Sequence, residues 1–174
     1  MSVVLDEMKT RRSIRKFKPD MVPADVLDQI IEAGTFAANG RGLQSPIIIA
    51  VTNKKMRDKI MEMNRMIGGW EEGFDPFYGA PVILIVLADA SCPTAVYDGS
   101  LTMGNLMLAA HDLGIGSCWI HRAKEEFASP EGKALLKEWG LSENYVGIGH
   151  CILGYRDCEY PEAKERKSDY IVRV

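Results

Sequence analysis

The sequence contains few cysteines, and they form no closely spaced pair. Its 4 thiols include no CxxC motif, whereas zinc sites usually show two such pairs at recognisable separations. Cys118 with His121, and His150 with Cys151, come nearest to ligand pairs, but buried cysteines in strands are the commoner explanation. Scattered thiols in a chain of 174 residues are typical of a reduced, intracellular protein. We therefore expect no metal site.

Long apolar runs and a strong excess of one charge are also absent. No stretch reaches membrane-spanning length without a charge, and the opening segment MSVVLDEMKT carries Asp6, Glu7 and Lys9 instead of the apolar run of a secretory signal. The 21 Lys and Arg residues nearly balance 24 Asp and Glu residues, which disfavours bulk nucleic-acid binding. We expect a cytoplasmic protein that binds neither membranes nor nucleic acids.

The motifs of several common enzyme classes are missing as well. No P-loop, Ser/His/Asp set or paired-carboxylate signature stands out. The segment GIGSCWIHR, residues 114–122, begins with GxG, but Trp119 stands where a dinucleotide fingerprint has its third glycine. No internal repeat, low-complexity tract or Pro/Ser-rich linker divides the chain. Residues 1–174 are therefore expected to form a single domain.

Apolar periodicity predicts strands that alternate with helices. The clearest strand is PVILIVLAD, residues 81–89, a continuous apolar run of the kind that is covered on both faces. Ser129 followed by Pro130 predicts a helix start, because Ser caps a helix and Pro is tolerated in its first turn. The alternation predicts an α/β or α+β domain in which helices flank a sheet. Further strands are predicted over 47–51 and 145–155, and helices over 2–10, 24–38, 53–67, 98–113 and 129–139.

Two segments have features beyond those of a plain domain. The segment 68–79 gathers Trp70, Phe74, Phe77 and Tyr78 among glycines and acids. Either these rings anchor an irregular loop to the core, or they form a lid over a planar ligand, since long functional loops are often lids. The helix over 98–113 is apolar on much of its circumference, which suggests a subunit interface as well as a core contact.

The N-terminal segment TRRSIRKFKP, residues 10–19, is called here the basic strip. In an extended chain side chains alternate between two faces, so Arg11, Ser13 and Arg15 would point to one side. Two guanidinium groups and a hydroxyl on one side suit an anion, because guanidinium forms bidentate bonds to phosphate oxygens. From spacing alone, a solvated strip, a nucleic-acid or nuclear-targeting patch and a phosphate site all remain open.

Two other segments carry polar groups that a ligand could use. The glycine-rich loop NGRGLQSP, residues 39–46, contains Asn39, Arg41 and Gln44, although a flexible helix-to-strand connection has the same composition. Near the C-terminus, KERKSDY includes Lys164 and Arg166 in a second basic cluster.

Four segments together resemble the nitroreductase-like flavoprotein family. They are RRSIRKF near the N-terminus, the glutamine-containing loop NGRGLQSP, the segment LGIGSCWI over 113–120 and the basic C-terminal tail. The resemblance covers nearly the whole chain and depends on the order and spacing of these segments. It implies an α+β fold whose central, mostly antiparallel sheet is flanked by helices. It also implies FMN as a cofactor and a homodimer with the long helix in its interface.

The resemblance further implies which residues contact FMN. Arg15 is the candidate cation beside the N1–C2=O edge of the ring, where reduction leaves negative charge. The expected cofactor-binding residues are Arg11, Arg12, Ser13 and Arg15 from the basic strip, Asn39, Gly42 and Gln44 from the loop, Ile120, His121 and Arg122 at the redox centre, and Lys164 and Arg166 from the tail.

The implied activity is that of an FMN-dependent oxidoreductase that takes electrons from NADH or NADPH and reduces nitroaromatic, quinone or similar electron-poor acceptors. Because flavin N5 carries the hydride, no side chain is assigned a catalytic step. A donor and an acceptor that use one flavin face in turn imply ping-pong kinetics. Two alternatives stay open: an FMN-binding carrier or redox-sensing module without rapid turnover, and a flavin-free protein that binds nucleic acid through the basic strip.

Overall fold

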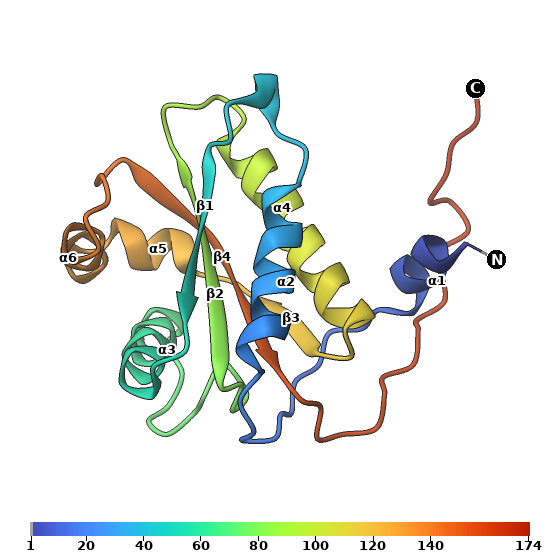
Figure 1. Ribbon diagram of the computed structural model, residues 1–174, viewed down its shortest axis with the longest axis horizontal. Helices are drawn as coiled ribbons and strands as arrows, with labels where there is room; N and C mark the ends of the chain where they lie inside the picture. Colours follow the sequence, from blue (N-terminus) through green and yellow to red (C-terminus); the bar gives the residue numbers. More distant parts are fainter. Residues whose placement is uncertain (1) are drawn as a thin grey trace.

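Figure 1 shows the computed structural model, which describes residues 2–174. Four strands form one sheet in the order β1-β2-β4-β3, and every neighbouring pair is antiparallel. This confirms the predicted α+β class with a central antiparallel sheet. The strands are β1 (Pro46–Val51), β2 (Val82–Asp89), β3 (Gly116–Ile120) and β4 (Tyr145–Gly154).

Helices cover both faces of the sheet (Figure 1). On one face α2 and α4 pack against β2 through Ile30, Leu106 and Leu84. On the other face α3 and α5 pack through Ile60 and Phe127, and α6 completes this layer. The helices are α1 (Val3–Thr10), α2 (Ala24–Thr35), α3 (Lys54–Gly68), α4 (Ala95–Asp112), α5 (Ala123–Ala128) and α6 (Pro130–Glu138), with a short 3-10 turn η1 (Gly40–Gly42).

Strand β2 shows why the sequence pattern specifies this sheet. Residues 82–88 are all buried, as a strand covered by helices on both faces requires. The predicted helix start at Ser129 is also confirmed, since its side chain accepts a hydrogen bond from the Gly132 amide at 3.0 Å. Most predicted boundaries lie within three residues of the observed ones.

Helix α2 ends at Thr35, three residues before its predicted end at position 38. The chain leaves the helix there and turns towards the first part of α4, where the amide of Gly40 donates to Asp98 Oδ1 at 2.9 Å. Helix α4 correspondingly begins at Ala95, three residues earlier than predicted. A long-range contact therefore joins the segment after α2 to the first turn of α4.

The basic strip is anchored along the free edge of β3. Ser13 pairs with Ser117 in a parallel bridge, and the amide of Ile14 donates to the Ser117 carbonyl at 2.9 Å. Ile14 is 1% exposed and Phe17 is 8% exposed, so the two apolar side chains of the strip enter the core. This arrangement holds the intervening cations at the surface beside the sheet.

Candidate functional site

The basic strip and the C-terminal tail meet around a cavity of about 480 Å³, called here the basic cavity. Both ends of the chain lie on the same side of the molecule (Figure 1). Two carboxylates, Glu162 and Glu165, also line the cavity, but cations outnumber them, which makes it suitable for an anion. Its cationic and hydroxyl residues are Arg11, Arg12, Ser13, Lys164, Arg166, Lys167 and Tyr170.

Within residues 2–174, two guanidinium atoms beside this cavity have no hydrogen-bond partner. Arg11 Nη1 and Arg12 Nε are buried without a hydrogen bond, and an unmade bond of this kind is costly unless a ligand supplies an acceptor. Arg12 also donates from Nη1 to the carbonyls of Lys9 at 2.8 Å and Arg11 at 2.7 Å, so it caps the end of α1 as well. The unpartnered donors fit the oxygens of a phosphate ester.

Three residues of the strip influence the Cys118 thiol on β3. Burial raises the pKa of the Cys118 thiol, while Arg15, the hydroxyl of Ser13 and Arg11 act in the opposite direction. The raised pKa keeps the thiol protonated near neutral pH, so Cys118 is not a nucleophile here.

The loop after β3 holds a strained residue. Arg122 has φ 78°, a left-handed conformation that is uncommon for a residue with a side chain. Three contacts hold it: Asn64 Nδ2 donates to the His121 carbonyl at 2.8 Å, the Glu126 amide donates to the Arg122 carbonyl at 3.0 Å, and the Arg122 guanidinium lies 4.4 Å from the Trp70 ring centroid. Strained residues fixed by their surroundings often mark functional sites.

A buried polar cluster contacts this loop through Asn64. Asn64, Glu126 and His150 are each 0% exposed. Asn64 Nδ2 donates to Glu126 Oε1 at 2.5 Å, and His150 Nε2 lies 2.8 Å from Glu126 Oε2 but outside hydrogen-bonding geometry. His150 is fully buried in the core, but neither of its ring nitrogens makes a hydrogen bond within residues 2–174, so the expectation of a core histidine with satisfied hydrogen bonds is only half met. The roles of Asn64 and Glu126 were not predicted, because no local motif links residues so far apart in sequence.

The aromatic segment 68–79 is anchored to the core. Phe77 is 0% exposed, and the Asp75 carboxylate accepts hydrogen bonds from the amides of Phe77 at 2.7 Å and Gly79 at 2.9 Å and from Arg57 at 2.5 Å. These contacts favour the anchoring interpretation over that of a freely moving lid. Trp70 extends from this anchored loop to Arg122, next to the segment that was predicted to face the flavin.

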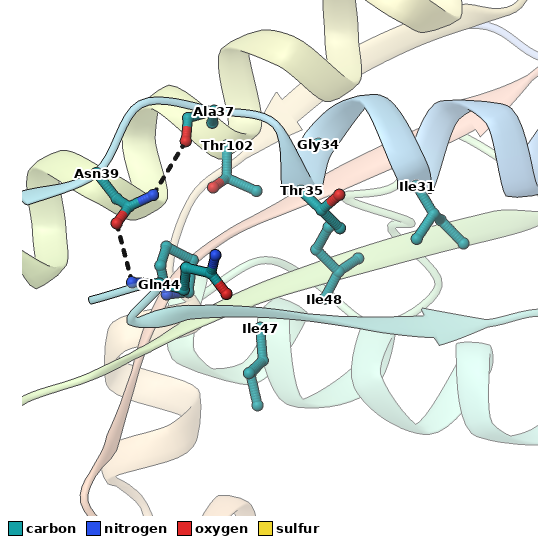
Figure 2. A pocket seen from close by; sticks show the side chains of 10 residues that line it. Ile31, Gly34, Thr35, Ala37, Asn39, Gln44, Ile47, Ile48 and Thr102 are labelled. Atoms are coloured by element: carbon teal, nitrogen blue, oxygen red, sulfur yellow. Dashed lines mark hydrogen bonds between the residues drawn. The ribbon is translucent and has the colours of Figure 1, made fainter. Parts of the chain in front are cut away.

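The loop 39–46 lies apart from the basic cavity and borders a second cavity of about 390 Å³ between α2 and β1 (Figure 2). Asn39 Oδ1 accepts from the Gln44 amide at 2.9 Å, and Asn39 Nδ2 donates to the Ala37 carbonyl at 3.3 Å. Gly42 has φ 69°, which favours glycine. Among the residues lining this cavity, Asn39, Gln44 and Thr102 bring polar groups to an otherwise mainly apolar wall.

Two independent measures separate this loop from the basic strip. The strip pairs with β3 and the loop leads into β1, so they lie at opposite edges of the sheet. With neighbouring strands about 4.8 Å apart, the strip and β1 are separated by roughly 19 Å. The loop also contacts Asp98 near the start of α4, whereas Thr10 contacts His111 near its end, and a rise of 1.5 Å per residue separates these positions by about 20 Å. One chain therefore does not bring the two groups together.

The described residues 2–174 contain no group of three or more His, Cys, Asp or Glu side chains arranged to hold a metal ion. Within the same residues, no helix combines the length and apolar character needed to cross a membrane.

An antiparallel sheet between two helical layers defines the class of protein, an α+β domain, and a cation-rich cavity lies where the basic strip and the C-terminal tail meet. The particular family follows from comparison with known proteins. The model of the nitroreductase family matches residues 8–155. The chain therefore belongs to the nitroreductase family.

Relatives of known structure share this fold along their whole length. A nitroreductase with bound FMN from Bacteroides fragilis has a TM-score of 0.89 and 31% identity, and the match covers 100% of both chains. Another from Desulfitobacterium hafniense, also with bound FMN, has a TM-score of 0.89 and 26% identity over 100% of this chain and 99% of that one.

A provisionally named NADH dehydrogenase/NAD(P)H nitroreductase from Methanothermobacter thermautotrophicus is 34% identical over 125 residues, which cover 67% of this chain. The match spans 59% of that relative's length.

Replacing Asp98 by Asn should loosen the attachment of the loop 39–46. Burial acts to raise the pKa of this carboxyl, but hydrogen bonds from the Gly40 amide and the Thr94 and Ser45 hydroxyls lower it below its ordinary 3.8. The amide can no longer accept from all three donors, so we expect about 1–3 kcal/mol of destabilisation at pH 7, measured by urea unfolding.

The stability difference between the wild type and the Asp98→Asn variant should also change with pH, in a direction that the lowered pKa of Asp98 determines. A carboxyl with a depressed folded pKa stabilises the protein fully above its unfolded pKa, and this contribution disappears as the pH falls through the folded value. The difference between the wild type and the Asp98→Asn variant should therefore shrink on acidification below about pH 4. The exposed Asp28→Asn exchange on α2 serves as the control. A difference that stays constant with pH would contradict the assignment.

Proposed function

We propose that this protein is an FMN-dependent NAD(P)H oxidoreductase that reduces nitroaromatic, quinone or similar electron-poor acceptors. The observation that carries the proposal is the basic cavity, in which buried guanidinium atoms of Arg11 and Arg12 lack a partner. The solved nitroreductases from B. fragilis and D. hafniense contain FMN, whose phosphate has the charge and acceptors that these atoms require.

The phosphate of FMN would be held by Arg11, Ser13, Lys164 and Arg166, which line the basic cavity from both ends of the chain. Arg12 supports the cavity through its bonds to main-chain carbonyls and offers Nε to the ligand. A phosphate placed there would be contacted by charge-assisted hydrogen bonds, which are about twice as strong as neutral ones.

The flavin ring would extend from the basic cavity along β3. Arg15, which acts on the Cys118 thiol from the strip side, would place its positive charge near the N1–C2=O edge. Ile120 ends β3, and His121 and Arg122 follow it in the loop that Asn64 holds through the His121 carbonyl; these residues would present main-chain groups to the N5 edge. FMN supplies hydride transfer at N5 when bound, and the protein supplies orientation and charge.

A second copy of the chain would complete the site as a homodimer. The loop 39–46, with Asn39, Gly42 and Gln44, lies at the sheet edge opposite the strip, so we assign its flavin contacts to the partner's site. Large apolar side chains are exposed on α1 and α4, including Val3 at 68% and Leu101 at 50%, and grouped exposed apolar residues mark association surfaces. Closed twofold dimers are the commonest oligomers.

Replacing both Arg11 and Arg166 by Ala should abolish stable FMN binding while leaving the fold intact. Each lost charge-assisted bond is worth roughly 1.5–3 kcal/mol, so affinity should fall by at least about 100-fold. Fluorescence titration of the apo-protein with FMN measures this loss. A double exchange of exposed lysines on other helices, Lys55→Ala with Lys137→Ala, matches the change in charge and should bind normally. Retention of FMN by the arginine variant through gel filtration would refute the phosphate assignment.

Anaerobic mixing with NADH or NADPH separates the enzyme from the alternative of a carrier or redox-sensing module. The enzyme should show rapid bleaching of the visible flavin absorbance. Double-reciprocal plots of its steady-state rate against donor concentration, taken at several acceptor concentrations, should be parallel, as ping-pong kinetics requires. Flavin that stays oxidised with both donors would instead support the alternative of a carrier or redox-sensing module. A colourless protein that fails to take up FMN and binds nucleic acid with steep salt dependence would instead favour the third alternative.

The two-chain site can be tested by mixing two defective variants. One carries Arg11→Ala and Arg166→Ala, and the other carries Asn39→Ala and Gln44→Ala; each homodimer should bind FMN poorly. A mixed dimer, purified through two different affinity tags, should regain one intact site and hold half the wild-type FMN per chain. If the strip and loop of the same chain served one site, the mixed dimer would regain none.

A further inference from the structure

The two halves of the basic cavity are attached to the fold in different ways. The strip is anchored to β3 by main-chain pairing and by the buried Ile14 and Phe17. The tail after β4 has no helix or strand, and residues 162–174 are exposed. Lys164 and Arg166 therefore need another device to keep them beside Arg11.

Tyr160 is the last tail residue with a hydrogen bond or ion pair to the rest of the fold. Within residues 161–174, the recorded bonds of this kind are local to the tail: Arg166 donates to the Lys164 carbonyl, Lys167 pairs with Asp169, and the Tyr170 amide donates to the Lys167 carbonyl. The side chain of Tyr160 thus marks the end of the anchored part of the tail, four residues before Lys164.

The Tyr160 hydroxyl bonds to both residues that flank Arg11. It accepts from the Arg12 amide at 3.0 Å and donates to the Thr10 carbonyl at 2.9 Å. The chain is thereby fixed on either side of the guanidinium-bearing residue whose Nη1 is buried without a partner. One hydroxyl group therefore restrains the strip and the tail together.

Other side chains orient the Tyr160 ring. His111, at the end of α4, stacks on it with ring centroids 5.9 Å apart and an interplanar angle of 19°, and its Nδ1 lies 3.3 Å from the hydroxyl. The Arg156 guanidinium lies 5.4 Å from the ring centroid. His111 is itself held by Thr10 Oγ at 3.0 Å and by Glu7 at 3.3 Å, so the tyrosine docks against a preformed surface of α1 and α4.

We propose that Tyr160 is a positioning residue that latches the C-terminal tail onto the basic strip and so assembles the binding site for the phosphate ester. The identity of that ester as FMN rests on the proposed function. The latch shortens the free segment before Lys164: without it, the nearest hydrogen-bonded tail anchor is the Asp157 amide, which donates to the Lys16 carbonyl at 3.0 Å, and Cys158 beside it packs against the core. A longer free segment lowers the effective concentration of Lys164 and Arg166 at the cavity.

The Tyr160→Phe exchange tests the latch because it keeps the ring and removes only the hydroxyl. Affinity of the apo-protein for FMN, measured by fluorescence titration, should fall about tenfold, the effect of roughly one lost hydrogen bond. Trypsin should cleave the tail of the apo-variant at 164–167 several times faster than that of the apo-wild type, because the tail is released. The Tyr145→Phe exchange at the start of β4 is the matched control, and it should change neither quantity.

The two readouts separate failure of the latch from failure of the proposed function. Wild-type affinity and wild-type tail cleavage in the Tyr160→Phe variant would overturn the latch. Faster cleavage with unchanged FMN affinity would overturn its positioning role. If the wild-type protein itself bound no FMN, the proposed function would fail, whereas tail cleavage in the apo-protein would still decide whether Tyr160 holds the tail.

Discussion

The attachment of the basic strip to the edge of β3 is the constraint on which the site depends. Burial of Ile14 and Phe17 draws an otherwise strongly cationic segment into the fold, and the bond between the Ile14 amide and the Ser117 carbonyl fixes its register. Full burial of side chains of this size stabilises a protein by about 1.5–3 kcal/mol each. Apolar anchoring thus offsets the repulsion among the neighbouring cations and holds them where an anion can reach them.

Helix α4 fixes the distance between the loop 39–46 and the tail, because each contacts one end of this helix. Asp98 near its start binds the loop 39–46, and His111 near its end contacts both α1 and the tail. The same helix therefore supports two groups of polar residues that stay apart within one chain. Its exposed side chains include Tyr97 and Leu101, and in the proposed homodimer a second copy would cover this outer face.

Much of the fold could be predicted from local patterns. The apolar run of β2 and the Ser129 cap are each determined by residues close together in the sequence, so both could be predicted from local patterns. The meeting of the strip with Lys164 and Arg166 followed from family resemblance, and the basic cavity is consistent with it. Periodicity alone leaves such a contact open, because it joins the two ends of the chain.

The remaining features depend on long-range contacts that have no local sequence signal. Asn64 and Glu126 are 62 positions apart and look like ordinary helix residues until the fold places both beneath the His121 carbonyl. The distance between Gln44 and Arg11 was also hidden, since a motif states which residues a site uses but not which copy of the chain supplies them. Strand order and the length of α4 place the two groups far apart within one chain, and their assignment to two copies rests on the proposed homodimer.

The bond between Tyr160 and Thr10 spans 150 positions in the sequence, and this has a consequence for how the protein is made. Contacts between distant residues carry a large loop-closure entropy and form late unless other structure has already shortened the path. On the ribosome the strip emerges first and must wait for β3, and then for the tail, before it has its partners. The basic cavity therefore depends on the segment after β4, and a chain truncated between Gly154 and Glu162 would contain the sheet strands but not the tail side of the cavity.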